Sequence, residues 1–513
     1  MKVPALIQRI EPVPFDALSY LCANAATRGS ELALYDQGTT LDFDSLLGAA
    51  LAFIDDLRVR GLGSGDVVAV ALPNVWHFVA LEIAIPAAGG VVLPLPMTLG
   101  RREIASSLER SGAKMIITDD SDRGNAIADG ARFIPSIQTV LAADELQTAS
   151  GAALEDVIVE GPDPDRVVQI ALTSGTTGPP KLASLTARLK QLTFEGFTTR
   201  LGLGPGDRML PLSPVTQGAG EMCLYALRTG AALVMSHDPR FDPERSLALT
   251  EQSRATVLGG VPTIISRMLH SAALEGADLS AVRTTISAGA PLPRTLAQAW
   301  EERSGSRVCS FYGAMDIGQL AVPSPNDPAE KRWTTVGRPH DCAELLICDP
   351  DGRPLPATQE GEICMRGPLV HERYWGELEG PCASDGWAHF GDLGYVDEEG
   401  YLHVTGRLKD TIIRGGTNIN PVEVEDLLRA LPSVRDACLV GRPDIDLGER
   451  AVAFIVAAPG SVPTHHHLLT HLEREGLARY KWPEDMRLVD ALPIGSTGKL
   501  DRQALQAQLH GEG

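Results

Sequence analysis

The 513-residue chain is too long for one ordinary domain, so two or more hydrophobic cores are expected. Hydrophobic residues make up 44% of the sequence and charged residues 22%, which is typical of a globular enzyme and excludes a largely disordered chain. The formal charge of −21 opposes binding to nucleic acid or to an anionic membrane, so neither is expected as a partner.

Cysteine usage and the apolar segments indicate a cytoplasmic protein. Residues 1–25 lack the basic start and apolar run of a signal peptide, and the most apolar stretch, 78–97, is interrupted by Glu82, Pro86 and glycines. The cysteines contain no CxxC pair, which argues against a zinc site and against a disulfide framework. They are Cys22, Cys223, Cys309, Cys342, Cys348, Cys364, Cys382 and Cys438.

Short β-branched runs alternate with helical patterns through the first 300 residues. Strands are expected at 66–72, 90–94, 114–118 and 167–172, and helices at 75–85 and 102–111. This alternation predicts an α/β fold with parallel sheets that are covered by helices on both faces.

The pattern changes twice toward the C-terminus. Between residues 335 and 407, short strands separated by Gly/Asp turns predict a small β-rich subdomain. A compact α+β unit of roughly 105 residues follows, which is an ordinary domain size. The predicted boundary is Lys409, with an N-terminal domain at 1–408 and a C-terminal domain at 409–513.

A loop rich in hydroxyl groups follows the strand at 167–172. Glycines leave its backbone free to wrap an anion, hydroxyls and amides supply donors, and a lysine adds positive charge. The Walker pattern Gly-x4-Gly-Lys-Ser/Thr is absent, and two prolines precede the lysine. The loop is predicted to bind phosphate, with a plain polar surface loop as the alternative; it reads Thr173, Ser174, Gly175, Thr176, Thr177, Gly178, Pro179, Pro180, Lys181.

This loop resembles the phosphate-binding signature of the adenylate-forming superfamily, which includes acyl-CoA synthetases, aryl-acid ligases, peptide-synthetase adenylation domains and luciferases. Further blocks resemble the superfamily in the same order over nearly the whole chain, at 287–292, 312–316, 361–368, 386–392, 406–410, 414–425 and 493–502. The resemblance implies a large N-terminal domain of two helix-covered sheets with a β-rich subdomain, followed by a small mobile α+β lid.

The resemblance also implies roles for individual residues. Lys181 and residues 173–178 would contact the phosphates of ATP, and Lys499 would bridge the acid carboxylate and the α-phosphate during catalysis. The remaining adenylate contacts would be Gly289, Ala290 and Pro291 beside adenine, Tyr312 stacking on it with Gly313 next to it in the chain, Asp316 on Mg²⁺, Asp392 on the ribose hydroxyls and Arg407 on ribose or phosphate. The residues alone leave other readings open, because Asp392 could form a turn and Arg407 an interdomain salt bridge.

Thioester formation requires a second site, since the thiol of coenzyme A must reach the acyl carbonyl after pyrophosphate has left. In the superfamily the C-terminal domain rotates about a hinge, which corresponds to Lys409 here. Gly415 and Gly416 would then line a narrow tunnel for CoA, where side chains would obstruct a close approach. A β-bulge is the alternative explanation for these glycines.

Three departures from the usual superfamily sequence concern the acid or ATP. Leu182 follows Lys181 where glycine is usual, Met315 and Asp316 replace a Thr-Glu pair, and Pro214 occupies a place where many relatives carry histidine. Weakened metal and phosphate contacts would slow adenylation more than thioester formation. An adenylation-impaired enzyme, supplied with acyl-adenylate by a partner ligase, is therefore one hypothesis.

The acid pocket is expected near Pro214, Gln217 and Gly218, where small residues would leave room for a bulky and largely apolar carboxylic acid. The alternative is that these glycines only shape a loop. The leading hypothesis is an acyl-CoA ligase that uses ATP (or a preformed acyl-AMP), Mg²⁺ and CoA. A stand-alone enzyme loading a separate carrier protein and a non-catalytic binding protein remain open.

Overall fold

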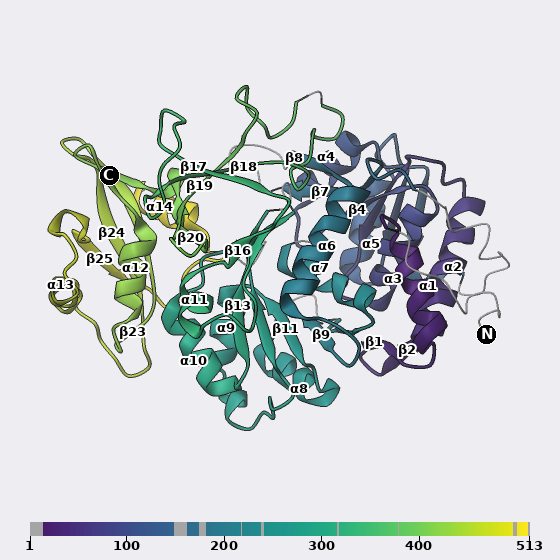
Figure 1. The fold of residues 1–513 in the computed structure, drawn as a ribbon, viewed down its shortest axis with the longest axis horizontal. Coiled ribbons are helices and arrows are strands. Elements are labelled where there is room, and N and C mark those ends of the chain that lie inside the picture. The colour runs from purple at the N-terminus through teal and green to yellow at the C-terminus, as the bar shows by residue number, and fades with distance from the viewer. Residues whose placement is uncertain are drawn as a thin grey trace.

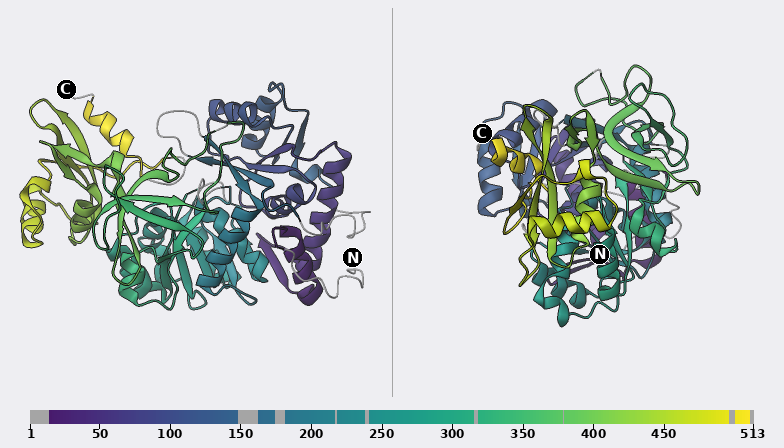
Figure 2. Two further views of the ribbon diagram at one scale, coloured as in Figure 1. Left: turned by 45° about the horizontal axis from the view of Figure 1, so that its top comes forward. Right: turned by 90° about the vertical axis from the view of Figure 1, so that its left-hand side faces the viewer.

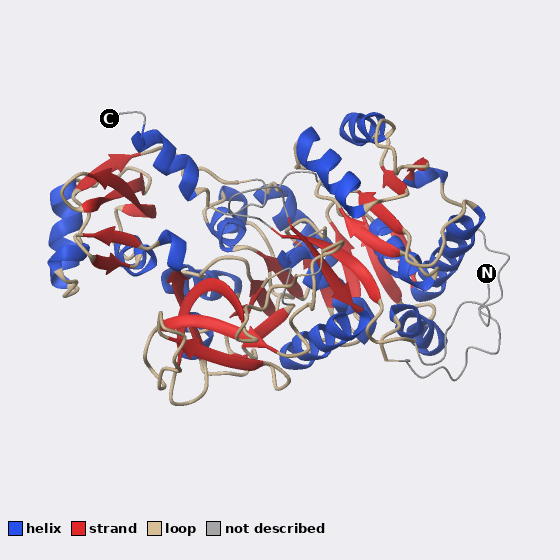
Figure 3. Ribbon diagram, turned by 90° about the horizontal axis from the view of Figure 1, so that it is seen from above, coloured by secondary structure: helices blue, strands red, loops and turns tan. Residues whose placement is uncertain are grey.

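The structure is a computed structural model that describes residues 14–147, 162–173, 181–216, 218–237, 241–314, 318–377, 379–495 and 500–510. Two large sheets lie side by side in the N-terminal part, with helices packed around them (Figures 1 and 3). The predicted α/β class is confirmed.

The first sheet has the strand order β6-β5-β3-β4-β7-β8. Every neighbouring pair is parallel except β7 and β8, which are antiparallel. Its strands are β3 (Val67–Ala71), β4 (Val91–Pro94), β5 (Met115–Thr118), β6 (Thr139–Ala142), β7 (Val167–Thr173) and β8 (Lys181–Thr186), and the helices between them are α3 (Trp76–Ala87), α4 (Arg101–Ser111) and α5 (Asp122–Ala131). All five residues of β3 are buried, as expected for a strand covered on both faces. The six of these elements that the sequence predicted, β3, β4, β5, β7, α3 and α4, match the prediction to within two residues at each end; β6, β8 and α5 were not predicted.

The second sheet has the order β13-β12-β11-β9-β10-β1-β2 and is parallel except for the edge strand β2. Its strands are β1 (Leu32–Asp36), β2 (Thr39–Asp42), β9 (Arg208–Pro211), β10 (Ala232–Met235), β11 (Val257–Gly260), β12 (Thr284–Ser287) and β13 (Arg307–Ser310). The helices around it are α1 (Ala17–Arg28), α2 (Phe43–Val59), α6 (Ala187–Leu201), α7 (Gly218–Cys223), α8 (Pro243–Ser253), α9 (Pro262–Leu269) and α10 (Arg294–Ser304). One continuous core with Phe78, Phe197 and Trp300 joins both sheets.

The β-rich subdomain predicted at 335–407 is present, its strands are antiparallel, and two further strands, β14 and β15, precede the predicted start. The larger sheet has the order β17-β18-β19-β20, from β17 (Glu344–Cys348), β18 (Gly361–Arg366), β19 (Ala388–Val396) and β20 (Leu402–Arg407). A smaller sheet has the order β14-β15-β16, from β14 (Tyr312–Gly313), β15 (Gln319–Val322) and β16 (Arg338–Pro339). Helix α11 (Ala329–Thr334) lies between β15 and β16 in the chain.

The C-terminal residues form a sheet of their own at one end of the molecule (Figures 1 and 2). Its order is β22-β21-β24-β23, with β25 beside β24. The elements are β21 (Ile412–Arg414), β22 (Thr417–Ile419), α12 (Pro421–Arg429), β23 (Val434–Asp444), β24 (Gly448–Ala457), α13 (His465–Arg474), β25 (Asp485–Leu488) and α14 (Arg502–His510). Lys409 lies in the short 3-10 helix η6 (Leu408–Asp410) that precedes this sheet, and the boundary there stays a prediction.

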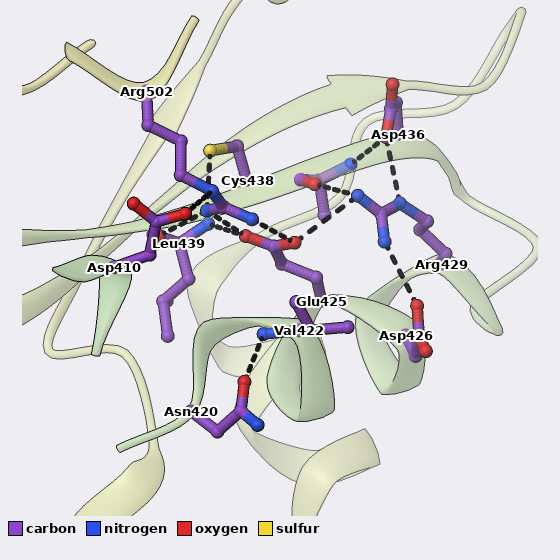
Figure 4. Close-up of polar contacts among 11 residues, drawn as sticks. Asp410, Asn420, Val422, Glu425, Asp426, Arg429, Asp436, Cys438, Leu439 and Arg502 are labelled. Atoms are coloured by element: carbon purple, nitrogen blue, oxygen red, sulfur yellow. Dashed lines mark hydrogen bonds and ion pairs between the residues drawn. The ribbon is translucent and has the colours of Figure 1, made fainter. Parts of the chain in front are cut away.

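A buried ionic network ties the ends of this unit together (Figure 4). Arg502, the first residue of α14, donates to both oxygens of Glu425 on α12, at 2.5 and 2.8 Å. Burial alone would lower the pKa of Arg502, but the Glu425 carboxylate raises it overall and keeps the guanidinium charged. The network therefore fixes the start of α14 against α12 and strand β23.

Among the described residues, no helix combines the length and the apolar composition needed to cross a membrane.

Candidate active site

Three of the residues predicted to bind adenylate converge on one carboxylate. Antiparallel pairing places Asp392 of β19 directly opposite Arg407 of β20, and Arg407 Nε lies 2.8 Å from Asp392 Oδ1. The Tyr312 hydroxyl, from the first residue of β14, donates to Asp392 Oδ2 at 2.7 Å. The structure thus joins residues that are 80 positions apart in the sequence.

The carboxylate of Asp392 is almost completely buried and is held in place by these two partners. Asp392 is 5% exposed, and a buried carboxylate needs hydrogen bonds and an opposite charge to remain ionised. Each carboxylate oxygen can accept more than one hydrogen bond, so both oxygens keep capacity for further donors such as hydroxyl groups. The Arg407 side chain is 45% exposed and can exchange its partner at low cost. Asp392 is therefore not a simple turn former.

Gly313 shapes the loop that follows Tyr312. A Cβ at this position would lie 2.4 Å from the carbonyl oxygen of Gly318, so any side chain would force the two backbones apart. The amide of Ala314 donates to that same carbonyl at 3.3 Å and closes the loop. Met315 and Asp316 lie outside the described residues, so the metal role of Asp316 stays a prediction.

The phosphate loop is described only at its two ends. Thr173 of β7 pairs with Lys181 of β8, which brings the ends of the loop together. The ammonium group of Lys181 lies 4.5 Å from the centre of the Tyr374 ring, within cation–π range. Ser174, Gly175, Thr176, Thr177 and Gly178 lie outside the described residues. No sequence signal pointed to Tyr374, which comes from a segment nearly 200 residues later.

Leu182 has a packing role that the sequence did not reveal. It is 1% exposed and belongs to the core of the first sheet, because alternate residues of β8 face opposite sides. Its backbone carbonyl accepts from the amide of Trp375 at 2.7 Å. Leu182 therefore fills the interior, and its side chain gives no reason to expect weaker phosphate binding.

The predicted adenine segment follows the end of β12. Gly289 has φ of +82°, a left-handed conformation that favours glycine, and it is exposed together with Pro291. Ala290 is half-buried between them. The turn thus presents backbone groups at the carboxyl end of a parallel strand, where open α/β sheets bind ligands.

Of the small residues near the predicted acid pocket, only some leave open space. Pro214 and Gly218 are exposed, Gly218 has φ of +51°, and Gln217 lies outside the described residues. A Cβ on Gly220 would lie 2.2 Å from the Pro214 carbonyl oxygen, so Gly220 allows helix α7 to approach the preceding loop. That glycine shapes the loop, whereas a Cβ on Gly218 would meet no atom within 4 Å.

The two glycines predicted to line a tunnel form a tight turn. Gly415 and Gly416 connect β21 to β22, with Arg414 opposite Thr417, and have φ of +56° and +79°. Two consecutive left-handed residues in a two-residue hairpin define a type I′ turn, for which glycine is favoured. They lie in a turn and not within a strand, and the bulge alternative is wrong. The tunnel role stays a prediction.

Lys499, the predicted catalytic lysine, lies outside the described residues, and its catalytic role stays a prediction, but the residues on either side of it are hydrogen-bonded. Ile494 and Leu500 form a bridge, and the amide of Asp501 donates to the Pro493 carbonyl at 2.9 Å. Partial burial and the nearby Arg407 charge lower the pKa of Lys409, whose role as the hinge stays a prediction. On either side of Lys409, Asn420 and Thr405 are joined by a hydrogen bond, which the Asn420 side chain donates to the Thr405 carbonyl at 2.9 Å.

Comparison with known proteins places the chain in a family. The AMP-binding enzyme model matches residues 21–375, and the model of the AMP-binding enzyme C-terminal domain matches residues 423–499. The chain belongs to this adenylate-forming family, in its acyl-CoA ligase branch, and is an AMP-forming acid–CoA ligase family enzyme.

Individual relatives cover nearly the whole chain. A feruloyl-CoA synthase from Amycolatopsis sp. is 33% identical over 90% of this chain and 93% of its own length. A sulfoacetate–CoA ligase from Cupriavidus necator is 32% identical over 97% of this chain and 99% of its own. The crystal structure of ATP-bound MatB from Rhodopseudomonas palustris superposes with a TM-score of 0.86 at 28% identity, over 97% of this chain and 99% of that one.

Proposed function

We propose that this enzyme joins a bulky, largely apolar carboxylic acid to coenzyme A through an acyl-adenylate. The observation that carries the proposal is the Tyr312–Asp392–Arg407 cluster, in which a tyrosine hydroxyl and a half-exposed guanidinium both contact one buried carboxylate. The resemblance implies that the Tyr312 ring stacks on adenine, and aromatic rings favour such stacking. The carboxylate then has free lone pairs for ribose hydroxyls.

The reaction joins two anions, so it depends on cations and oriented donors more than on a general base. Lys499 would bridge the carboxylate and the α-phosphate, and Lys181 would meet the outer phosphates. Mg²⁺ commonly takes one or two carboxylates together with substrate phosphates, and Asp316 offers one such carboxylate. The donor set fits this metal, which would neutralise charge on the departing pyrophosphate when bound.

Support for a bulky acid comes from Gly218, beside which open space remains. The relatives are named for acids as different as ferulate and sulfoacetate, so they do not indicate the size of the acid that this enzyme uses. The preferred acid size is therefore measured directly. Pyrophosphate release should be faster with aromatic and polycyclic acids than with acetate or propionate. Gly218→Asn, a residue that accepts the left-handed conformation, should lower kcat/KM for bulky acids selectively. Equal rates with acetate and large acids would reject the bulky-acid proposal.

The two half-reactions can be measured separately by supplying different substrates. Free acid with ATP reports adenylation as pyrophosphate, and synthetic acyl-adenylate with CoA reports thioester formation. Comparable rates are expected, because Leu182 is explained by packing. If only the second assay gives product, the enzyme requires adenylate from a partner ligase, and Asp316→Glu with Met315→Thr should restore part of the first step. Acyl transfer to a phosphopantetheinyl carrier but not to CoA would reject the ligase assignment.

A further inference from the structure

A cluster of sulfur, nitrogen and oxygen side chains lies on the larger sheet of the β-rich subdomain, outside the Tyr312–Asp392–Arg407 cluster. Its members are Cys348, Glu362, Cys364 and His389, whose potential ligand atoms all lie within 4.8 Å of one another. We call these four residues the Cys–His cluster.

Strand register explains how the four side chains meet. Cys348 at the end of β17 pairs with Glu362 of β18, and Cys364 of β18 pairs with His389 of β19. Side chains two residues apart on one strand, and side chains directly opposite across an antiparallel pair, share a face of the sheet. The cluster therefore lies on one face of three adjacent strands, with one residue from β17, two from β18 and one from β19.

The distances are close to those of a tetrahedral metal site. The two sulfur atoms are 3.4 Å apart, Cys364 Sγ lies 3.3 Å from His389 Nδ1, and that nitrogen lies 2.9 Å from Glu362 Oε2. A zinc ion with bonds of about 2.3 Å to sulfur and about 2.1 Å to nitrogen or oxygen holds its ligands roughly 3.3–3.8 Å apart. A slight outward rotation of the side chains reaches this geometry.

Outer contacts orient two of the ligands. Asp385 Oδ2 lies 3.1 Å from His389 Nε2, so that nitrogen can donate to the carboxylate. Without metal, Nδ1 donates to Glu362 Oε2; on metal binding it would give up that proton and direct its lone pair toward the ion. The amide of Gly391 donates to Glu362 Oε1 at 3.2 Å, which leaves Oε2 toward the cluster. A carboxylate behind a ligating histidine is the usual arrangement in zinc proteins.

We propose that the Cys–His cluster is a structural zinc site. Two thiolates and an imidazole favour zinc over the hard cations, and four protein ligands leave no open position for a substrate. Binding would release the two thiol protons to solvent, because only thiolates ligate the metal. The ion would link β17, β18 and β19. Its ligand His389 precedes Asp392 by three residues on β19. The site is independent of the proposed reaction.

The sequence prediction of no zinc site rested on the absence of a CxxC pair. Here the two cysteines are 16 positions apart and the histidine follows 25 positions later, so three strands supply the ligands and no compact motif reveals them. Antiparallel pairing alone brings them together.

The test measures metal in the full-length protein, purified under reducing conditions without a histidine tag. We expect about one zinc per chain, and after replacement by cobalt a sulfur-to-cobalt charge-transfer band. The band matters because residues 465–467 are consecutive histidines that can retain zinc without any thiol. Cys348→Ser and Cys364→Ser should each reduce zinc content and the band, whereas Cys382→Ser, at an exposed cysteine outside the cluster, should leave both unchanged.

A milder variant protects the test against misfolding. Asp385→Asn keeps all four ligands and should weaken zinc affinity roughly 10–100-fold, with unchanged circular dichroism. A cobalt complex without the sulfur band, or zinc content that is the same in the two cluster variants as in the wild type, would overturn the proposal.

Discussion

At the scale of single residues, Asp392 has the most constrained environment of the predicted site residues that the structure describes. Its two oxygens contact a phenol and a guanidinium, and a charge-assisted hydrogen bond is stronger than a neutral one. None of this follows from the spacing of Tyr312, Asp392 and Arg407 in the sequence. The resemblance supplied the roles, and the strand pairing supplies the contacts.

Replacing Asp392 by asparagine should weaken binding of a non-hydrolysable acyl-adenylate analogue. The variant keeps the shape but loses the negative charge, and one hydrogen bond to a charged group contributes about 1.5–3 kcal/mol, or roughly 10–100-fold in affinity. Calorimetry measures the change. The matched control is Glu398→Gln, which removes an exposed charge from the hairpin between β19 and β20 and should leave affinity unchanged. Equal affinity of wild type and Asp392→Asn would contradict the assigned role.

Leu182→Ala should destabilise the N-terminal domain without changing adenylation per folded molecule. Truncating a fully buried leucine typically costs about 2–5 kcal/mol, part of it from the cavity that remains. Urea denaturation checks the stability, and pyrophosphate release under native conditions checks the activity. A stable variant with faster adenylation would show that Leu182 acts on ATP after all.

At the scale of elements, the sequence predicted those strands and helices whose bounds depend on the local pattern of apolar residues. Strand β3 is a continuous apolar run because both of its faces are covered, and the predicted bounds are correct to within a residue. The turn at Gly415 and Gly416 was not predicted, because a glycine pair alone does not distinguish a close approach to a ligand, a bulge and a left-handed turn. The backbone φ values decide between them.

Gly416→Asn distinguishes the role of Gly416 in the turn from its predicted role in the CoA tunnel. Asparagine tolerates the left-handed conformation, so folding should persist, whereas a side chain facing CoA should slow thioester formation by roughly 10²-fold and spare adenylation. Gly400→Asn is the control, since Gly400 also has positive φ and open surroundings. Both half-reactions are assayed in each variant, and an unimpaired thioester step in Gly416→Asn would place the tunnel elsewhere.

At the scale of the whole molecule, the C-terminal sheet is separate from the two N-terminal sheets, and the buried Arg502–Glu425 pair fixes the start of α14 within that unit. Composition changes along the chain predicted this division, because each unit has its own core. Rotation of one unit against the other was predicted from the resemblance alone.

Lys409→Pro tests that rotation. Proline fixes φ near −65°, so the variant should populate one arrangement of the two units and lose one half-reaction at least tenfold more than the other. Pyrophosphate release and thioester formation from synthetic adenylate provide the two rates. Val462→Pro, at an exposed position in a loop of the C-terminal unit, controls for general damage. An equal change in both half-reactions would contradict a hinge at Lys409.

The most direct test of the central claim measures AMP and acyl-CoA formed from ATP, CoA and a bulky acid in wild type and in Lys499→Ala. Lys499→Ala should lose adenylation by about 10²–10³-fold, since it removes a cation aimed at the reacting oxygens. The account predicts equimolar AMP and acyl-CoA from the wild type, with an acyl-adenylate trapped when CoA is omitted. Release of ADP, or acyl-CoA formed at the same rate by wild type and Lys499→Ala, would contradict it.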